Sequence, residues 1–102
     1  LLAAARARRE AGANQALADL AENLAGIDAA RRSEALATDD LLPAAELTFK
    51  AALAGYESGK LDFATLLDAQ RQIRQARQEK IKAQAEGQVR LAEIERLLGE
   101  DL

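Results

Sequence analysis

The chain of 102 residues contains no cysteine, histidine, methionine or tryptophan, and it has one proline and three aromatic residues. Without thiol, imidazole or thioether groups, it offers no ligand set for a transition metal and no side chain that titrates near neutral pH. These absences argue against an enzyme, and we expect no catalytic residue, no bound metal and no cofactor. The lack of cysteine fits a reducing or an oxidising compartment equally well.

Residues that favour β-strands are also scarce, because isoleucine, valine and threonine total eight. The 50 apolar side chains are instead dominated by 25 alanines and 17 leucines. Alanine and leucine are the strongest helix formers among the apolar residues. The composition therefore predicts an all-α fold.

The charges are balanced, with 14 basic and 17 acidic residues that are interspersed along the chain and leave a net charge of −3. This pattern argues against nucleic acid as a partner, and we interpret the basic stretch around Arg71, Arg74 and Arg77 as a solvated or ion-paired helix face. The N-terminal residues include no initiating methionine and no long apolar run, so they predict neither a signal peptide nor a membrane span. We expect the chain to be a fragment of a larger protein.

In the first half of the chain, the most regular apolar stripe is formed by Leu17, Leu20, Leu24 and Ile27. Its 3-4-3 spacing is typical of a helix that packs against another helix. The stripe lapses and resumes near Leu41, next to the single proline. Two outcomes are open at this point: the helix continues through Pro43 with a kink, or it breaks and restarts with an aspartate cap. Alanine-rich flanks favour the kinked, continuous helix.

The clearest break in the helical pattern lies at residues 56–63. Gly59 can adopt the left-handed conformation that ends a helix, and Asp62 can cap the next helix by accepting hydrogen bonds from its first turn. With Asp62 as the N-cap, Leu61 and Leu66 occupy the two positions of a hydrophobic staple. We therefore predict one α-hairpin segment over residues 1–102, with a first arm at 1–58, a tip at 59–62 and a second arm at 63–98.

The second arm carries apolar, small and a few charged residues at heptad spacing, which predicts one face that packs closely against the first arm. This face consists of Leu66, Ala69, Ile73, Ala76, Lys80, Ala83, Gly87, Arg90, Ile94 and Leu97. Gly99 is predicted to end the arm and to leave residues 99–102 as a tail. Both arms rise by about 1.5 Å per residue, so the longer first arm should extend past the second. About 20 N-terminal residues are then left without a partner in the hairpin.

A two-helix layer of alanine and leucine buries little apolar surface. The free energy gained by this burial is too small to offset the conformational entropy that the chain loses on folding. In isolation, the hairpin is therefore expected to self-associate or to fold its N-terminal segment back as a third helix. In its native setting it is expected to belong to a larger bundle.

Residues 54–71, AGYESGKLDFATLLDAQR, resemble the hairpin tip of the TolC-like outer-membrane efflux proteins. That family carries a pattern close to A-x-Y-x-x-G, a short turn, and a helix that opens into L-D-A-Q-R. Tyr56 and Gly59 match the first part, and residues 67–71 match the second. The run LLPAAE at 41–46 is similar to a segment of the heavy-metal, CzcC-like branch of the family. The run AEIERLLG at 92–99 is similar to the segment at which the second helix of the hairpin ends in the family. Residues 1–40 match only as a long alanine- and arginine-rich helix.

The resemblance implies a homotrimeric channel in the outer membrane of a Gram-negative bacterium, continued through the periplasm by a long helical barrel. It also implies docking of the hairpin tips to a periplasmic adaptor, the membrane fusion protein, which engages an inner-membrane pump. The chain would be one periplasmic hairpin of such a protein, soluble as a fragment, and the parent would export heavy-metal cations. An alternative is a stand-alone coiled-coil interaction module.

The resemblance assigns adaptor docking to five residues of the tip, which are Ser58, Gly59, Lys60, Leu61 and Asp62. It places Tyr56 and Asp68 at the periplasmic entrance of the channel, where three copies of the aspartate would form a ring that favours cations. Each assignment has a structural alternative. The tip residues can simply cap and staple a turn, Tyr56 can pack between the arms, and Asp68 can be a surface charge that is favourable near a helix N-terminus.

Overall fold

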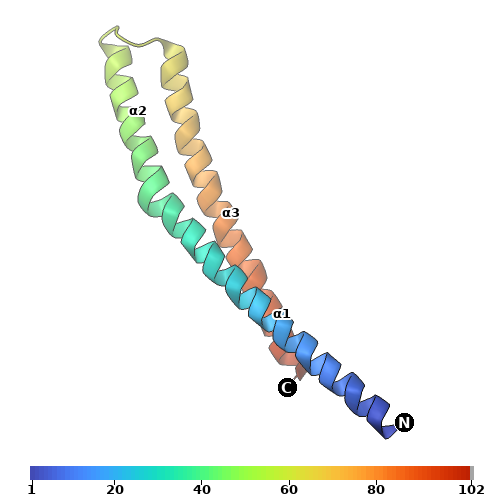
Figure 1. Ribbon diagram of the computed structural model, residues 1–102. Helices are drawn as coiled ribbons and strands as arrows, with labels where there is room; N and C mark the ends of the chain where they lie inside the picture. The colour runs from blue at the N-terminus through green and yellow to red at the C-terminus, as the bar shows by residue number, and fades with distance from the viewer. Residues whose placement is uncertain (102) are drawn as a thin grey trace.

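The computed structural model describes residues 1–101, and it consists of two long antiparallel helical arms (Figure 1). The first arm comprises helix α1, Leu2–Leu36, a π-helical turn η1, Ala37–Leu41, and helix α2, Leu42–Glu57. The second arm is helix α3, Phe63–Asp101. No strand occurs among residues 1–101. The predicted all-α hairpin is therefore confirmed.

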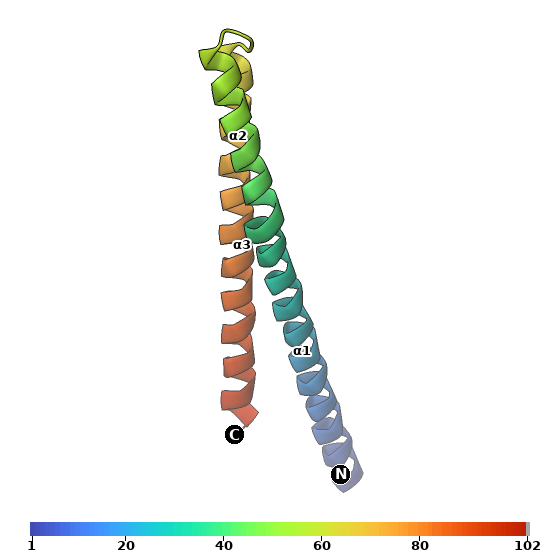
Figure 2. The same ribbon diagram turned by 90° about the vertical axis from the view of Figure 1, so that its left-hand side faces the viewer.

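The hairpin is a thin rod with principal extents of 82 × 19 × 15 Å. Its radius of gyration is 22.9 Å, whereas a compact domain of this length has about 13 Å. The N-terminal part of α1 diverges from α3 and continues past its end (Figure 2), and residues 1–15 are exposed throughout. The predicted overhang is present, and the N-terminal segment does not fold back as a third helix.

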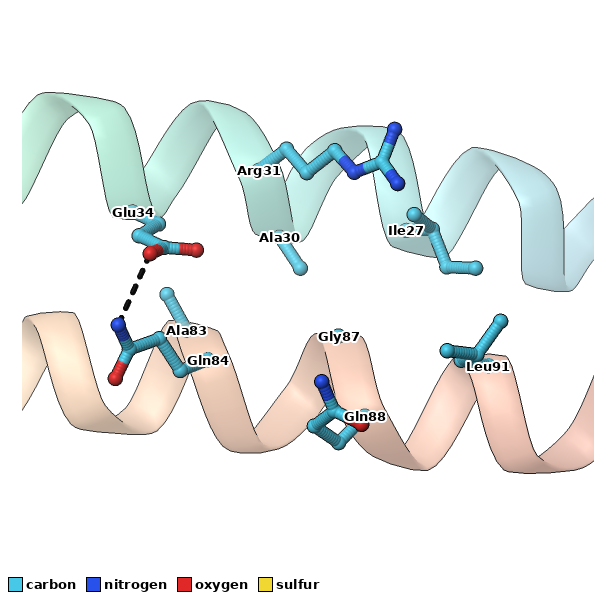
Figure 3. Close-up of a pocket in the computed structure, with 9 residues that line it drawn as sticks. All are labelled: Ile27, Ala30, Arg31, Glu34, Ala83, Gln84, Gly87, Gln88 and Leu91. Carbon is cyan, nitrogen blue, oxygen red and sulfur yellow. Dashed lines mark hydrogen bonds between the residues drawn. The ribbon is translucent and has the colours of Figure 1, made fainter.

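The interface between the arms is built largely from alanine, which allows the two helix backbones to approach closely. Its buried apolar residues are Ala30, Ala37, Ala45, Ala52, Ala69, Ala76, Ala83, Ile94 and Leu97. Ala30 and Ala83 point into the space between the helices, and Gly87 faces the same space (Figure 3). All ten residues of the predicted face of the second arm are buried or half-buried.

The predicted stripe of the first arm is correct only in part. Leu20 and Ile27 are half-buried, but Leu17 and Leu24 are 64% and 53% exposed. The helix turns Asn23 and Ala30 toward α3 instead. The sequence carries two stripes on neighbouring faces of α1, and the partner packs on the one with the smaller side chains.

The first arm passes Pro43 without a break, as the first of the two alternatives predicts, and it does so through the π-helical turn. The amide of Leu42 donates to the carbonyl of Ala37, five residues earlier, which is the π-helical bonding pattern. A proline has no amide to donate and its ring crowds the carbonyl four residues earlier, so a wider turn just before Pro43 relieves both problems. The arm bends over this region, between the turquoise and green segments of Figure 1.

The π-helical turn also keeps the alanines of the first arm on one face. Ala30 and Ala37 are seven residues apart and Ala45 and Ala52 are seven apart, but eight residues separate Ala37 from Ala45. One π-helical turn holds about one residue more than an α-helical turn. The extra residue is thereby absorbed, and the buried alanines stay in line along α3.

At the other end of the chain, the predicted stop at Gly99 is wrong. Helix α3 continues through Gly99 and Glu100 to Asp101. A glycine ends a helix when it adopts a positive φ, and among residues 1–101 only Gly59 does so. Residue 102, the last of the predicted tail, lies outside the described residues.

Candidate functional site

The tip of the hairpin begins where α2 ends, and backbone hydrogen bonds fix its shape. Gly59 has φ 78°, the left-handed conformation predicted for it. The amide of Lys60 donates to the carbonyl of Gly55 over 2.8 Å, and the amide of Gly59 donates to that of Tyr56 over 3.0 Å. These two bonds together form a Schellman motif, which satisfies the last carbonyls of the helix. The Ser58 hydroxyl adds a third bond to the Gly55 carbonyl.

Helix α3 begins with the predicted cap. The Asp62 carboxylate accepts hydrogen bonds from the Thr65 hydroxyl at 2.7 Å and from the Thr65 amide at 2.9 Å. These two bonds lower the pKa of Asp62 below its ordinary value of 3.8. The charge also lies at the helix N-terminus, where the helix dipole favours an anion. The cap therefore fixes the direction in which α3 leaves the turn.

The Leu61 side chain folds back over the end of α2. A Cβ placed on Gly55 would lie 2.6 Å from Leu61 Cδ1, so only glycine leaves room for this contact. Leu61 is still 39% exposed. The turn thus presents an apolar side chain that contacts the end of α2 on one side and solvent on the other.

The structure brings all five predicted docking residues, Ser58 to Asp62, together on the exposed end of the rod. Tyr56 lies beside them and packs edge-to-face against Phe63, with the ring centroids 5.9 Å apart. Phe63 is 59% exposed and was not among the predicted site residues. A signal for it was present, because two of the three aromatic residues of the chain flank the turn.

Asp68 lies in α3, beyond the capping turn, and makes no hydrogen bond to the tip turn within residues 1–101. Its carboxylate pairs with Arg71 at 3.4 Å, and both side chains are more than 60% exposed. The i,i+3 spacing brings the two side chains together on the surface of α3, as it does for the pair between Glu93 and Arg96. Exposed pairs of this kind stabilise a helix only weakly.

The described residues hold no group of three or more histidine, cysteine, aspartate or glutamate side chains that could bind a metal ion. Across residues 1–101, no helix combines the length and the apolar character that a membrane crossing requires. What the tip offers is a shaped surface of apolar, small and charged groups.

The sequence profile of the outer membrane efflux protein family matches residues 2–100. The chain belongs to the outer membrane efflux protein family. Proteins of this family are homotrimeric outer-membrane channels that work with adaptor proteins, and the family is one of transport components rather than enzymes. Searches of the curated proteins and of the solved structures found no match. The family match covers both arms and the tip, including residues 2–40, where the sequence motifs carried little information.

Proposed function

We propose that this chain is the periplasmic α-hairpin of an outer-membrane efflux protein in a tripartite export system, and that its tip docks onto a periplasmic adaptor. The observation that carries the proposal is the tip itself. Exposed Leu61 and Phe63 stand at the end of an 82 Å rod, on a turn whose conformation is fixed by a Schellman motif and a helix cap. A rigid apolar tip is suited to contact with another helical hairpin.

Leu61 tests the docking role most sharply, because it is exposed and belongs to the turn. In the full-length trimer, Leu61→Asp should weaken binding to the adaptor at least about tenfold, as expected for an apolar contact at the centre of an interface. Leu47→Asp is the matched control, because Leu47 is 70% exposed on the shaft of α2, away from the tip. Binding is measured by titration with the adaptor, and circular dichroism confirms that both variants are helical.

Equal binding by the wild type and Leu61→Asp would overturn docking through the tip turn. Equal weakening by Leu61→Asp and Leu47→Asp would place the contact along the shaft, which also contradicts the proposal. A parent protein that shows no adaptor binding at all would favour the stand-alone coiled-coil alternative.

We also propose that Tyr56 and Asp68 line the entrance of the assembled channel and that the cargo is a heavy-metal cation. The LLPAAE run at 41–46 supports the heavy-metal cargo, because it is similar to a segment of the heavy-metal, CzcC-like branch of the family. Three exposed copies of Asp68 in a trimer would raise the local concentration of cations. Asp68→Asn in the reconstituted trimer should therefore lower the preference for cations over anions, measured as a reversal potential. If the ion selectivity of Asp68→Asn equals that of the wild type, Asp68 does not form a cation-selective ring. If cells that lack the parent protein tolerate heavy metals as well as cells that have it, heavy-metal cations are not its cargo.

A further inference from the structure

The alanine interface leaves open which helices pair and at which register. Ala69, Ala76 and Ala83 follow one another at intervals of seven residues on α3, and Ala30 on α1 and Ala37 on η1 are also seven residues apart. A shift of one heptad, or exchange of one arm for an arm of another copy, would again place alanine against alanine. Repeating seams of this kind need a distinct layer to select one pairing.

Within residues 1–101, two side-chain hydrogen bonds join α1 and α3, and only one of them involves a buried residue. The bond from Gln84 Nε2 to Glu34 Oε1 at 3.0 Å is exposed, and the other is made by Arg90. Arg90 occupies the next position of the α3 series, seven residues after Ala83. Its Nη1 donates to Asn23 Oδ1 at 3.2 Å, and its Nε donates to Glu86 Oε1 at 3.0 Å. The Asn23 amide nitrogen donates in turn to the Asp19 carbonyl at 2.9 Å. Asn23 is only 7% exposed, so α1 and α3 share a satisfied polar group inside an apolar interface.

Gly26 supplies the space for this group. A Cβ on Gly26 would lie 2.7 Å from Arg90 Nε and 2.9 Å from Arg90 Cδ. The guanidinium therefore passes directly over the α1 backbone at a position without a side chain. Glycine is otherwise unfavourable in the interior of a helix, and this close approach gives its presence a physical reason.

We propose that Arg90, Asn23 and Gly26 form a pairing lock, which selects α1 of the same chain as the partner of α3 and fixes the register of the two arms. A shift of one heptad would replace Gly26 by Asp19 or Ser33, whose Cβ atoms collide with the guanidinium. It would also replace Asn23 by Ala16 or Ala30, which carry no amide. In either case Asn23, which is 7% exposed, loses Arg90 as its donor, and a buried polar group without its partner is unfavourable.

Disulfide trapping can report the pairing, because the chain contains no cysteine. A Cβ on Gly87 would lie 3.7 Å from Ala30 Cβ, within the range of about 3.5–4.5 Å that a disulfide needs. The double variant Ala30→Cys/Gly87→Cys of the 102-residue chain is oxidised at low concentration. Non-reducing electrophoresis then separates intramolecular from intermolecular bridges. The intramolecular product should dominate, and a reference chain that forms none would overturn the pairing.

In this background, Arg90→Ala should lower the ratio of intramolecular to intermolecular product about fivefold, which corresponds to the loss of one net hydrogen bond. Gly26→Ala should have a similar effect, although it removes no polar group and raises helix propensity. The matched control is Arg96→Ala, because the ion pairs of Arg96 with Glu93 and Glu100 lie within α3. Its ratio should stay unchanged.

A lower ratio in Gly26→Ala cannot be attributed to unfolding of α1, because alanine has a higher helix propensity than glycine. Circular dichroism on the same samples gives the helix content of each variant. If Arg90→Ala and Gly26→Ala both retain the ratio of Arg96→Ala, the alanine interface selects its partner unaided and the pairing lock is refuted.

Discussion

The Asp62 carboxylate caps the first turn of α3, and its chemistry makes the cap dependent on pH. Both of its hydrogen bonds come from Thr65 and favour the ionised form, so its pKa is lower in the folded chain than in the unfolded one. A group of this kind stabilises the fold above its unfolded pKa, and the contribution is lost as the pH falls through the folded value.

We therefore expect Asp62→Ala to unfold at a lower temperature than the wild type at pH 7, with a difference that shrinks below a pH of about 4. Asp62→Asn is the matched variant, because asparagine also caps helices but carries no charge. It should retain most of the stability and lose the acid dependence. Thermal unfolding followed by circular dichroism from pH 2 to 7 measures both. A constant difference between the wild type and Asp62→Ala over this range would mean that the cap does not depend on the ionised carboxylate.

At the scale of the helices, the sequence predicts the second arm better than the first. Every predicted residue of the α3 face is buried or half-buried, because its heptad pattern is uninterrupted. In α1, Leu17 and Leu24 suggest a regular stripe, yet Asn23 is the residue that turns inward. A buried asparagine is recognisable only from Arg90, which lies 67 residues away. Glu93 also lies at i,i+3 spacing from Arg90, but Arg90 bonds to Glu86 and Asn23 instead.

The tip was predictable for a related reason, because its signals are local. A left-handed glycine and a capping aspartate act within a few residues of the chain, and both take the predicted roles. The π-helical turn was not predicted, because it satisfies two structural requirements at once, one local and one set by packing against α3. Pro43 needs a wide turn before it, and Ala45 must face α3 again after it. Only the packed hairpin reveals the second requirement.

The interpretation of the π-helical turn can be tested by deletion. Removing exposed Asp39 together with Pro43→Ala should convert the turn to α-helix, because the alanines would then repeat every seven residues. The hairpin should retain its helix content and a similar free energy of unfolding. Deleting exposed Lys50 in the same Pro43→Ala background is the control, because it rotates Ala52 and the tip by about 100°. It should cost about 2 kcal/mol or more. Urea titration measures both variants, and equal stability would show that the register of the alanines is unimportant.

At the scale of the whole molecule, the two ends of the rod differ in what they contribute. Residues 1–15 at the N-terminus are exposed, whereas Ile94 and Leu97 near the end of α3 are each 8% exposed. The thin shape leaves no third layer within residues 1–101 to cover the overhang. Stability of the hairpin should therefore come from the region where both arms are present.

Truncation from each end separates the two contributions. Removing residues 1–11 should change the free energy of unfolding by no more than about 0.5 kcal/mol, as for surface changes generally. Removing residues 94–102, a segment of similar length, should cost about 3–6 kcal/mol, because two aliphatic side chains lose their burial at about 1.5–3 kcal/mol each. Urea unfolding at low protein concentration measures both. If the first truncation destabilises the chain as much as the second, the overhang must pack on a neighbouring copy in solution. If neither does, the base of the hairpin is frayed, and the stability of the rod is confined to the alanine interface nearer the tip.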